Sequence, residues 1–208
     1  MAHFDDAAAT WDDPAKLERA QRASALLRER LPLRTTDRVL DVGAGTGQLT
    51  FNLIDAIGSA TISDSSAGMI EQAQLKIEQG KLTERVEARQ LDLTDSADQL
   101  EAESYDGAWS MLALHHVDDI ELLLRRVRDV LRPGGWVAVI DLDADDDGAF
   151  HEHNPDFDGH HGFSRDAFAQ SLQNAGFTDI EISDGGIVDK EVHEQIRPFP
   201  LFLAIARK

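Results

Sequence analysis

The stretch Val39–Thr50 reads VLDVGAGTGQLT and joins a short apolar run to three closely spaced glycines. This pattern predicts a buried strand that turns sharply into a helix, with glycines that let a ligand approach the backbone. A glycine-rich turn that binds nothing is the alternative. A dinucleotide-binding loop would need G-x-G-x-x-G, and Gln48 stands where its third glycine belongs. Asp41, two residues before Gly43, would repel a diphosphate and attract a cation, so the stretch favours a positively charged ligand.

Helix-like and strand-like segments alternate on both sides of this stretch. The alternation predicts one doubly wound α/β domain over residues 1–208, with a largely parallel sheet. Residues 1–34 are expected to form a helical extension or lid, and residues 143–163 an acidic, histidine-rich insertion. The predicted helices are Pro14–Leu31, Gln48–Ile57, Ala67–Gln79, Asp118–Leu131 and Ser164–Ala175, and the predicted strands are Asp37–Val42, Ser59–Asp64, Glu84–Leu91, Tyr105–Leu112, Trp136–Leu142, Phe177–Ile182 and Phe202–Arg207.

The composition excludes several classes of partner and site. The 208 residues include 20 Lys and Arg against 39 Asp and Glu, a formal net charge of −19, which repels nucleic acid and anionic membrane surfaces. Because the chain has no cysteine, it has no disulfide, zinc–thiolate site or thiol nucleophile. The first residues lack the basic and apolar regions of a signal peptide, and no apolar run is long enough to span a membrane. The sequence therefore predicts a cytoplasmic protein that binds neither nucleic acid nor membranes.

Several motifs, in this order, resemble those of the class I S-adenosylmethionine-dependent methyltransferases. The first is the acid and G-x-G-x-G of the stretch above; the others are ISDSSAGMI around Asp64, QLDLTD around Asp92, YDGAWS from Tyr105 and LRPGG from Leu131. Each motif is weak alone, since an acid that ends a second strand also fits a dehydrogenase. Together they cover most of the chain. The resemblance implies a seven-stranded sheet of order 3-2-1-4-5-7-6, with the last strand antiparallel and helices on both faces.

The resemblance also implies S-adenosyl-L-methionine as the cofactor and S-adenosyl-L-homocysteine as its product. Asp64 would hold the ribose hydroxyls through bidentate hydrogen bonds. Met69 would pack on the adenine, with Asp92 and Leu93 beside it. The cofactor-binding residues that the resemblance implies are Asp41, Gly43, Ala44, Gly45, Thr46, Gly47, Asp64, Ser65, Met69, Asp92, Leu93 and Met111.

The reaction that the resemblance implies is methyl transfer to a small-molecule acceptor by in-line displacement. Enzymes of this fold that methylate amino groups of nucleic acids resemble one another in a [DNS]PP[YFW] motif, but this chain has MLAL at Met111–Leu114. Cytosine-C5 and arsenic methyltransferases depend on cysteine, which is absent. The main alternative is a non-catalytic cofactor-binding or regulatory protein of the same fold. A protein side-chain methyltransferase is favoured less, and a nicotinamide oxidoreductase would need the missing third glycine.

Two histidine pairs are candidates for the acceptor site. His115 and His116 follow the fourth predicted strand, at the edge where open α/β sheets bind ligands. We expect His116 to act as a base or to contact the substrate; the alternative is that the pair caps the next helix or shapes the pocket. His160 and His161 lead into the helix that begins at Ser164, and we expect His161 to contact the substrate. His116 and His161 are therefore the predicted catalytic residues.

The acidic insertion at residues 143–163 holds four of the eight histidines, and no Lys or Arg occurs between Pro133 and Ser164. Its carboxylates and imidazoles would in principle suit a divalent metal ion. The spacing matches neither H-x-x-E-H nor D-x-D-x-D-G, so we favour a solvated acidic segment and predict no metal site. By resemblance, the insertion covers the substrate pocket, where its charge would favour cationic or neutral substrates.

Trp11 lies in the N-terminal extension, in the sequence FDDAAATWDD. The extension resembles the variable segment that folds over the pocket in small-molecule members of the family. Trp11 is therefore expected either to anchor a lid over the cofactor or to pack against the helix Pro14–Leu31.

Overall fold

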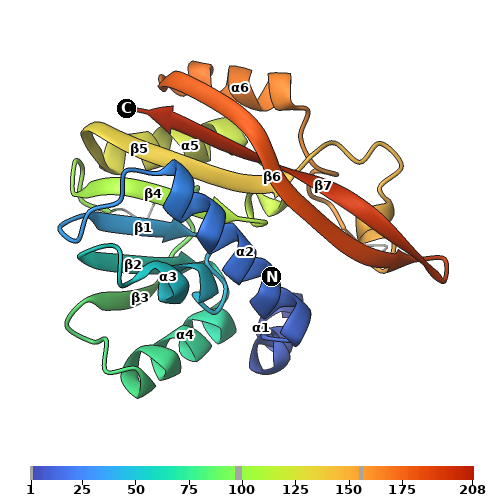
Figure 1. The fold of residues 1–208 in the computed structure, drawn as a ribbon, viewed down its shortest axis with the longest axis horizontal. Helices are drawn as coiled ribbons and strands as arrows, with labels where there is room; N and C mark the ends of the chain where they lie inside the picture. The colour runs from blue at the N-terminus through green and yellow to red at the C-terminus, as the bar shows by residue number, and fades with distance from the viewer. Residues whose placement is uncertain (1, 97–99, 155–156) are drawn as a thin grey trace.

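The computed structural model describes residues 2–96, 100–154 and 157–208. In this part of the chain, seven strands form one mixed sheet of order β3-β2-β1-β4-β5-β7-β6 (Figure 1). β7 is antiparallel to both of its neighbours, and the other neighbouring strands are parallel. The predicted fold class and strand order are confirmed. The strands are β1 Arg38–Val42, β2 Ser59–Asp64, β3 Val86–Gln90, β4 Tyr105–Met111, β5 Leu131–Leu142, β6 Thr178–Val192 and β7 Gln195–Arg207.

The five predicted helices lie where the sequence placed them; the helix Ala67–Gln79 has the predicted bounds, and the other four are shorter than predicted. In the described chain the helices are α1 Ala2–Ala7, α2 Pro14–Arg30, α3 Gln48–Leu53, α4 Ala67–Gln79, α5 Ile120–Val130 and α6 Arg165–Asn174, with short 3₁₀ helices η1 Ala8–Thr10, η2 Leu114–His116 and η3 Ala149–His151. The Ser164 side chain caps α6, as the sequence predicts. α3 ends at Leu53 rather than at Ile57, because the chain already turns after Leu53 on its way to Gly58.

Helices cover both faces of the sheet because its central strands are buried on both sides. In β5, Trp136 and Ile140 pack in an apolar cluster with residues of α2, α3 and α4. Val137 and Val139 pack in a second cluster, with residues of α5 and α6. A strand that is buried on both faces has an almost continuous apolar sequence. This explains why the strand was recognisable without any alternation of polar and apolar residues.

The hairpin formed by β6 and β7 is much longer than predicted. Pairing continues from Ile187↔Pro200 to Val192↔Gln195, and the two strands extend well past the rest of the sheet (Figure 1). The sequence predicted that the first of these strands ends at Ile182, before the glycine pair Gly185–Gly186. In the structure the glycines mark a shift in strand register between Asp184 and Gly186, and the strand resumes after it.

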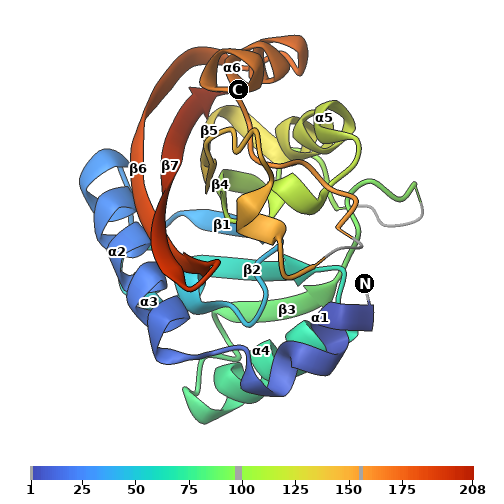
Figure 2. The same ribbon diagram turned by 90° about the vertical axis from the view of Figure 1, so that its right-hand side faces the viewer.

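The carboxyl ends of the parallel strands bring four segments to one edge of the sheet. The glycine-rich loop follows β1, Asp64 ends β2, η2 follows β4, and the segment 143–163 follows β5. Figure 2 shows η3 lying over the ends of β4 and β5, with α1 beside α4. Ligands of open α/β sheets bind at this edge. Among the described residues, no helix combines the length and the apolar character needed to cross a membrane.

Candidate functional site

The glycine loop, residues 43–47, can be built only with glycine at its two ends. Gly43 has φ +62°, and a Cβ added there would lie 2.5 Å from the Cβ of Ala113. Gly47 has φ +84°, and its added Cβ would lie 2.6 Å from Cδ1 of Ile62. Other residues would be strained by the left-handed backbone and would also collide with these neighbours. The sequence pattern therefore reflects both backbone conformation and close packing.

The middle of the loop is open by comparison. A Cβ added to Gly45 would have Nε1 of Trp11 at 3.6 Å and Sδ of Met69 at 3.9 Å as its nearest neighbours, which is ordinary contact distance. The preceding residue, Ala44, is held in place by a hydrogen bond from its N–H to the carbonyl oxygen of Ser63 in β2, over 2.9 Å. The loop therefore presents its Gly45 backbone toward Trp11 and Met69.

Asp64 is tied directly to this loop. Its Oδ2 accepts a hydrogen bond from the N–H of Gly45 over 2.8 Å, and its Oδ1 accepts one from the N–H of Ser66 over 2.9 Å. Burial raises the pKa of Asp64, and these two hydrogen bonds oppose the rise. Each oxygen of a carboxylate has room for a second donor. The side chain is therefore fixed in direction and retains capacity for the hydroxyl groups of a ligand.

Asp41 lies beneath the loop and is only 1 % exposed. Its Oδ2 accepts a hydrogen bond from Oγ1 of Thr50 in α3 over 2.6 Å. Burial raises the pKa of Asp41 to about 6, against the opposing effect of the Thr50 hydrogen bond. The carboxylate therefore connects β1 to α3, and a nearby cationic ligand would favour its ionised form.

The other residues expected at the cofactor lie along the same edge. Met69 in α4 is buried, and so is Leu93 after β3. Oδ1 of Asp92 accepts hydrogen bonds from the N–H and the hydroxyl of Thr94, at 2.9 and 2.6 Å, which fixes the turn after β3. The carbonyl of Ser65 accepts from Nε2 of Gln90, and Met111 ends β4 half-buried.

The N-terminal segment is fastened to the loop by acids that the sequence analysis did not single out. The carboxylate of Asp12 accepts hydrogen bonds from Oγ1 of Thr46 over 2.6 Å and from Nε2 of Gln48 over 2.9 Å, and it forms an ion pair with Lys76 of α4. The carboxylate of Asp5 accepts from Oγ of Ser66, at the start of α4. In the sequence these acids look like ordinary surface charges, because nothing local marks their partners.

Trp11 lies beside both the glycine loop and α2. Its Nε1 lies beside Gly45, and Nζ of Lys16 in α2 lies 4.6 Å from its ring centroid. Its ring also contacts Phe4, with the centroids 5.7 Å apart. The N-terminal segment therefore covers the loop while Trp11 also contacts the first turn of α2.

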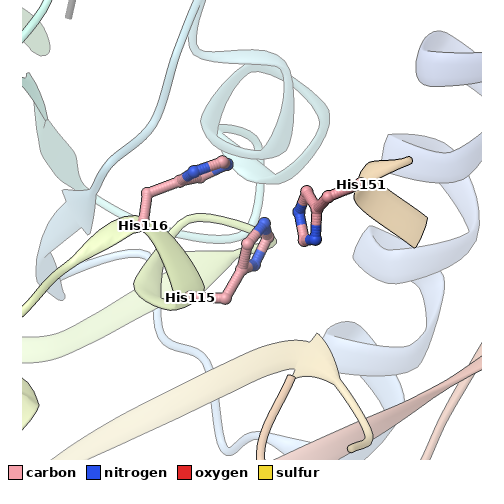
Figure 3. Close-up of side chains that lie close together, drawn as sticks. All are labelled: His115, His116 and His151. Carbon is pink, nitrogen blue, oxygen red and sulfur yellow. The ribbon is translucent and has the colours of Figure 1, made fainter. Parts of the chain in front are cut away.

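Three imidazoles meet at the carboxyl ends of β4 and β5. His115 and His116 in η2 and His151 in η3 each offer a nitrogen, and these nitrogens all lie within 4.8 Å of one another (Figure 3). We call these three residues the histidine cluster. It joins two segments that are far apart in sequence, so spacing within the acidic insertion could not predict it.

The orientation of His115 is set by Asp141 at the end of β5. Nδ1 of His115 lies 2.6 Å from Oδ1 of Asp141, and both residues are buried. The same carboxylate accepts hydrogen bonds from the backbone N–H groups of Leu114 and Leu142. We assign the proton of His115 to Nδ1, because the carboxylate can only accept there. Nε2 of His115 then carries a lone pair.

His151 is 9 % exposed and stacks on Phe157, with ring centroids 3.6 Å apart and an interplanar angle of 4°. Both of its ring nitrogens are buried, and neither has a hydrogen-bond partner among the described residues. Burial, followed by the nearby rings of His115 and His116, lowers the pKa of His151 to about 3. The imidazole is therefore neutral over the physiological pH range.

The two predicted catalytic histidines take different places. His116 belongs to the histidine cluster, is exposed, and contacts the ring of Phe4 at 5.1 Å between centroids. His161 is exposed on the far side of His151, 5.5 Å from it between ring centroids. His160 turns away, with Nε2 lying 3.0 Å from the carbonyl oxygen of Val117. The structure thus brings His116 together with His115 and His151, and not directly with His161.

The acidic insertion is less negative in its surroundings than its sequence suggests. Arg165 of α6 pairs through two nitrogens with the carboxylate of Asp143, both at 2.7 Å. Arg197 of β7 pairs with Asp145 at 3.2 Å and with Asp147 at 2.7 Å. The expectation that the negative charge of this segment has no positive charge beside it is therefore wrong. Two arginines outside the segment neutralise part of that charge.

The chain is similar to known methyltransferases in sequence and in fold. Residues 39–135 match the family described as "Methyltransferase domain". The 27-O-demethylrifamycin SV methyltransferase of Amycolatopsis mediterranei is 34% identical over 141 residues, covering 64% of this chain and 49% of that protein. The O-methyltransferase resE of Aspergillus sclerotiorum is 28% identical over 211 residues, covering 93% of this chain and 73% of that protein. This chain spans about half the length of the first two curated relatives that it matches.

A solved structure described as a SAM-dependent methyltransferase from Aquifex aeolicus has the same fold. It superposes with a TM-score of 0.71 at 21% identity, covering 98% of this chain and 97% of that one. The matched segment, residues 39–135, contains the glycine loop, Asp64, Asp92 and the LRPGG motif. Residues 39–135 are therefore similar in sequence to a methyltransferase family, and the chain as a whole has the fold of SAM-dependent methyltransferases.

Proposed function

We propose that this protein transfers the methyl group of S-adenosylmethionine to a hydroxyl group of a small molecule. The main support for this proposal is the arrangement at one edge of the sheet. There, a glycine loop that is hydrogen-bonded to Asp64 lies next to a region lined by imidazoles. Ala113, immediately before η2, packs against Gly43, so the loop and the histidines are neighbours. The names of two relatives, a 27-O-demethylrifamycin SV methyltransferase and an O-methyltransferase, support oxygen as the acceptor atom.

The residues present fit the cofactor. Asp64 keeps acceptor capacity for two vicinal hydroxyls, and the nearest side chains to the face of Gly45 are Trp11 of the N-terminal segment and Met69. Buried Met69 and Leu93 offer apolar surface to an aromatic base. When bound, the cofactor supplies an electrophilic methyl group on a positively charged sulfur. Asp41, buried below the loop, adds a carboxylate that favours a cation at this place.

The chain's own contribution to the reaction is alignment and exclusion of water. Asp12 and Asp5 fasten the N-terminal segment across the glycine loop and the start of α4, with Trp11 beside Gly45. A covered site holds the reacting atoms in line and keeps water from competing with the acceptor. His116, at the exposed rim of the histidine cluster, is assigned to the acceptor side.

His161 is a second contact that we assign to the acceptor. It is exposed and lies next to His151 on the segment 143–163. His161→Ala is expected to lower turnover while leaving the affinity for the cofactor intact. An unchanged rate with the physiological acceptor would contradict this assignment.

The function is tested by binding and turnover together. We expect calorimetry to detect adenosylmethionine and adenosylhomocysteine but not NAD. A panel of hydroxylated small molecules, screened for release of adenosylhomocysteine, should then contain an acceptor. Binding of NAD instead of adenosylmethionine would contradict the cofactor assignment. Cofactor binding without transfer to any class of acceptor, including protein side chains, would favour a non-catalytic cofactor-binding protein.

A further inference from the structure

The histidine cluster has a use beyond contacting an acceptor. We propose that His115, His116 and His151 together bind one divalent transition-metal ion of the zinc type, between η2 and η3. The proposal does not depend on methyl transfer, because it rests on the donor atoms and their surroundings alone.

The geometry of the cluster is close to that of a metal site. The three nitrogens lie within 4.8 Å of one another, and Figure 3 shows the rings converging from two separate segments. Nitrogens bound to tetrahedral zinc at about 2.0–2.1 Å are about 3.3 Å apart. The rings therefore need only a small inward rotation to share an ion. His116 is exposed, so its ring has space to make that adjustment.

Asp141 gives His115 the second contact that metal-bound histidines usually have. Its Oδ1 lies 2.6 Å from Nδ1 of His115, and two backbone N–H groups hold the carboxylate in place. Histidine ligands commonly donate their other ring N–H to a carboxylate, which fixes the ring and makes the ligating nitrogen a stronger donor. Asp141 is fully buried, so its negative charge also offsets part of the charge of an ion.

His151 supplies the observation that points most directly to a ligand. Its ring is stacked on Phe157, so the plane of the ring is fixed and its edge is left to polar partners. Neither nitrogen finds a hydrogen bond within the described parts of the chain, although both are buried. Buried polar atoms without partners are rare and call for an explanation such as a bound ion. A metal ion between His151 and η2 would provide a partner for one of these two nitrogens.

The donor set selects the class of metal. All three ligands are imidazoles, which suit zinc, cobalt, nickel and copper, whereas magnesium and calcium prefer oxygen ligands. Three protein ligands leave one position of a tetrahedral ion open, as in zinc sites that take water or an oxygen-containing ligand. An ion held here would therefore offer this position to an oxygen atom of a small molecule, and His116 would contact the acceptor through the ion.

The test uses the full chain, prepared without a histidine tag and stripped of metal with a chelator. Titration with Co²⁺ is followed by visible absorption, and titration with Zn²⁺ by calorimetry. We expect one ion per chain, with the intense visible bands of tetrahedral Co²⁺. His151→Phe keeps a ring against Phe157 but removes both nitrogens, so it should fold, as checked by circular dichroism, and lose the site. His153→Ala, on an exposed histidine of the same segment, is the matched control and should bind as the wild type does.

Asp141→Asn tests the same site with a smaller expected loss of metal affinity. The amide oxygen can still accept from one of the two backbone N–H groups, which bond to different oxygens of the carboxylate, but the charge that orients His115 is gone. We expect the affinity for Zn²⁺ to fall by about 10–100-fold, less than in His151→Phe. The proposal is overturned if the wild type binds neither ion, or if His151→Phe binds Co²⁺ as tightly as the wild type, since the ion would then lie elsewhere.

Discussion

The glycine loop and the histidine cluster lie at the same edge of the sheet but are built in different ways. The loop is local: the chain from Asp41 to Gly47 carries its own conformation, and Asp64 fixes it with one hydrogen bond. The cluster is assembled from η2 and η3, and Asp141 and Phe157 hold its rings. A site made by backbone geometry is visible as a sequence motif, whereas a site made by side chains from distant segments appears only in the folded chain.

The largest effect is expected at the base of the loop. Gly43→Ala combines a left-handed backbone with a Cβ only 2.5 Å from Ala113. We expect a loss of about 4 kcal/mol in the free energy of unfolding, measured by urea denaturation. Gly134→Ala is the control, because Gly134 also has positive φ but has no atom within 4 Å of an added Cβ. Gly134→Ala should lower the free energy of unfolding by about 1 kcal/mol. Equal losses in both variants would show that the close contact with Ala113 does not contribute to the effect of Gly43→Ala.

The pH dependence of stability tests the burial of Asp41. Its pKa is raised from 3.8 to about 6 in the folded protein, so folding favours the protonated form. This contribution is fully present below about pH 3.8 and is lost as the pH rises through about 6. The loss reaches up to about 3 kcal/mol. Asp41→Asn removes it, so the variant should gain stability relative to the wild type between pH 4 and 7.

Asp55 contributes to the pH dependence of stability with the opposite sign to Asp41 and serves as the comparison. Its pKa is lowered by a hydrogen bond from Arg28. Its stabilising contribution is therefore present above its ordinary pKa and lost as the pH falls. The stabilities of Asp41→Asn and Asp55→Asn, each measured relative to the wild type by urea denaturation over the same pH range, should change in opposite directions with pH. A difference between Asp41→Asn and the wild type that stays constant over this range would show that the carboxylate is solvated.

On the side of the histidine cluster, His116 is expected to affect turnover rather than cofactor binding. His116→Ala should lower turnover about a hundredfold, the usual effect of losing a proton acceptor or its equivalent. The dissociation constant for adenosylmethionine, measured by calorimetry, should stay unchanged. Treating the wild type with a chelator separates the two roles: an equal loss of turnover indicates action through an ion, and no loss indicates a direct base. A weakened affinity for adenosylmethionine would place His116 on the cofactor side instead.

The smallest effect is expected where the N-terminal segment is fastened to the loop. Asp12→Ala removes the hydrogen bonds from Thr46 and Gln48 and the ion pair with Lys76. We expect a loss of about 1 kcal/mol in stability and faster proteolysis within residues 2–13. Asp6→Ala, on an exposed acid of the same segment, should change neither. If Asp12→Ala is cut no faster than the wild type, the segment is held mainly by Trp11 and Phe4.

The sequence predicted the order of the sheet because each strand and helix carries a local signal. Apolar runs such as Trp136–Leu142 mark strands that are buried on both faces, and glycines mark their ends. The same signal misled at Gly185–Gly186, where a shift in strand register was read as the end of a strand. No local signal showed that Arg165 and Arg197 would neutralise the acidic segment, since both lie outside it.

The candidate site divides in the same way. The residues around the glycine loop follow from motifs, and their roles in binding the cofactor stay predictions. His151 was noted only as one of several histidines in an acidic segment, and the absence of a metal site was predicted from spacing within that segment. Its relation to His115 and His116 depends on how β5 and η3 return over η2, which only the fold determines.

The most direct measurement is the affinity for adenosylhomocysteine of the wild type, Asp64→Ala and Asp55→Ala, by calorimetry. We expect one molecule per chain and a loss of about 1.5–3 kcal/mol in Asp64→Ala, a drop of about 10- to 150-fold, from the missing charge-assisted hydrogen bonds. Asp55→Ala, which removes an exposed carboxylate paired with Arg28 of α2, should bind as the wild type does. Absence of binding in the wild type, or equal affinity in Asp64→Ala, would contradict the assignment of the glycine loop and Asp64 to the cofactor.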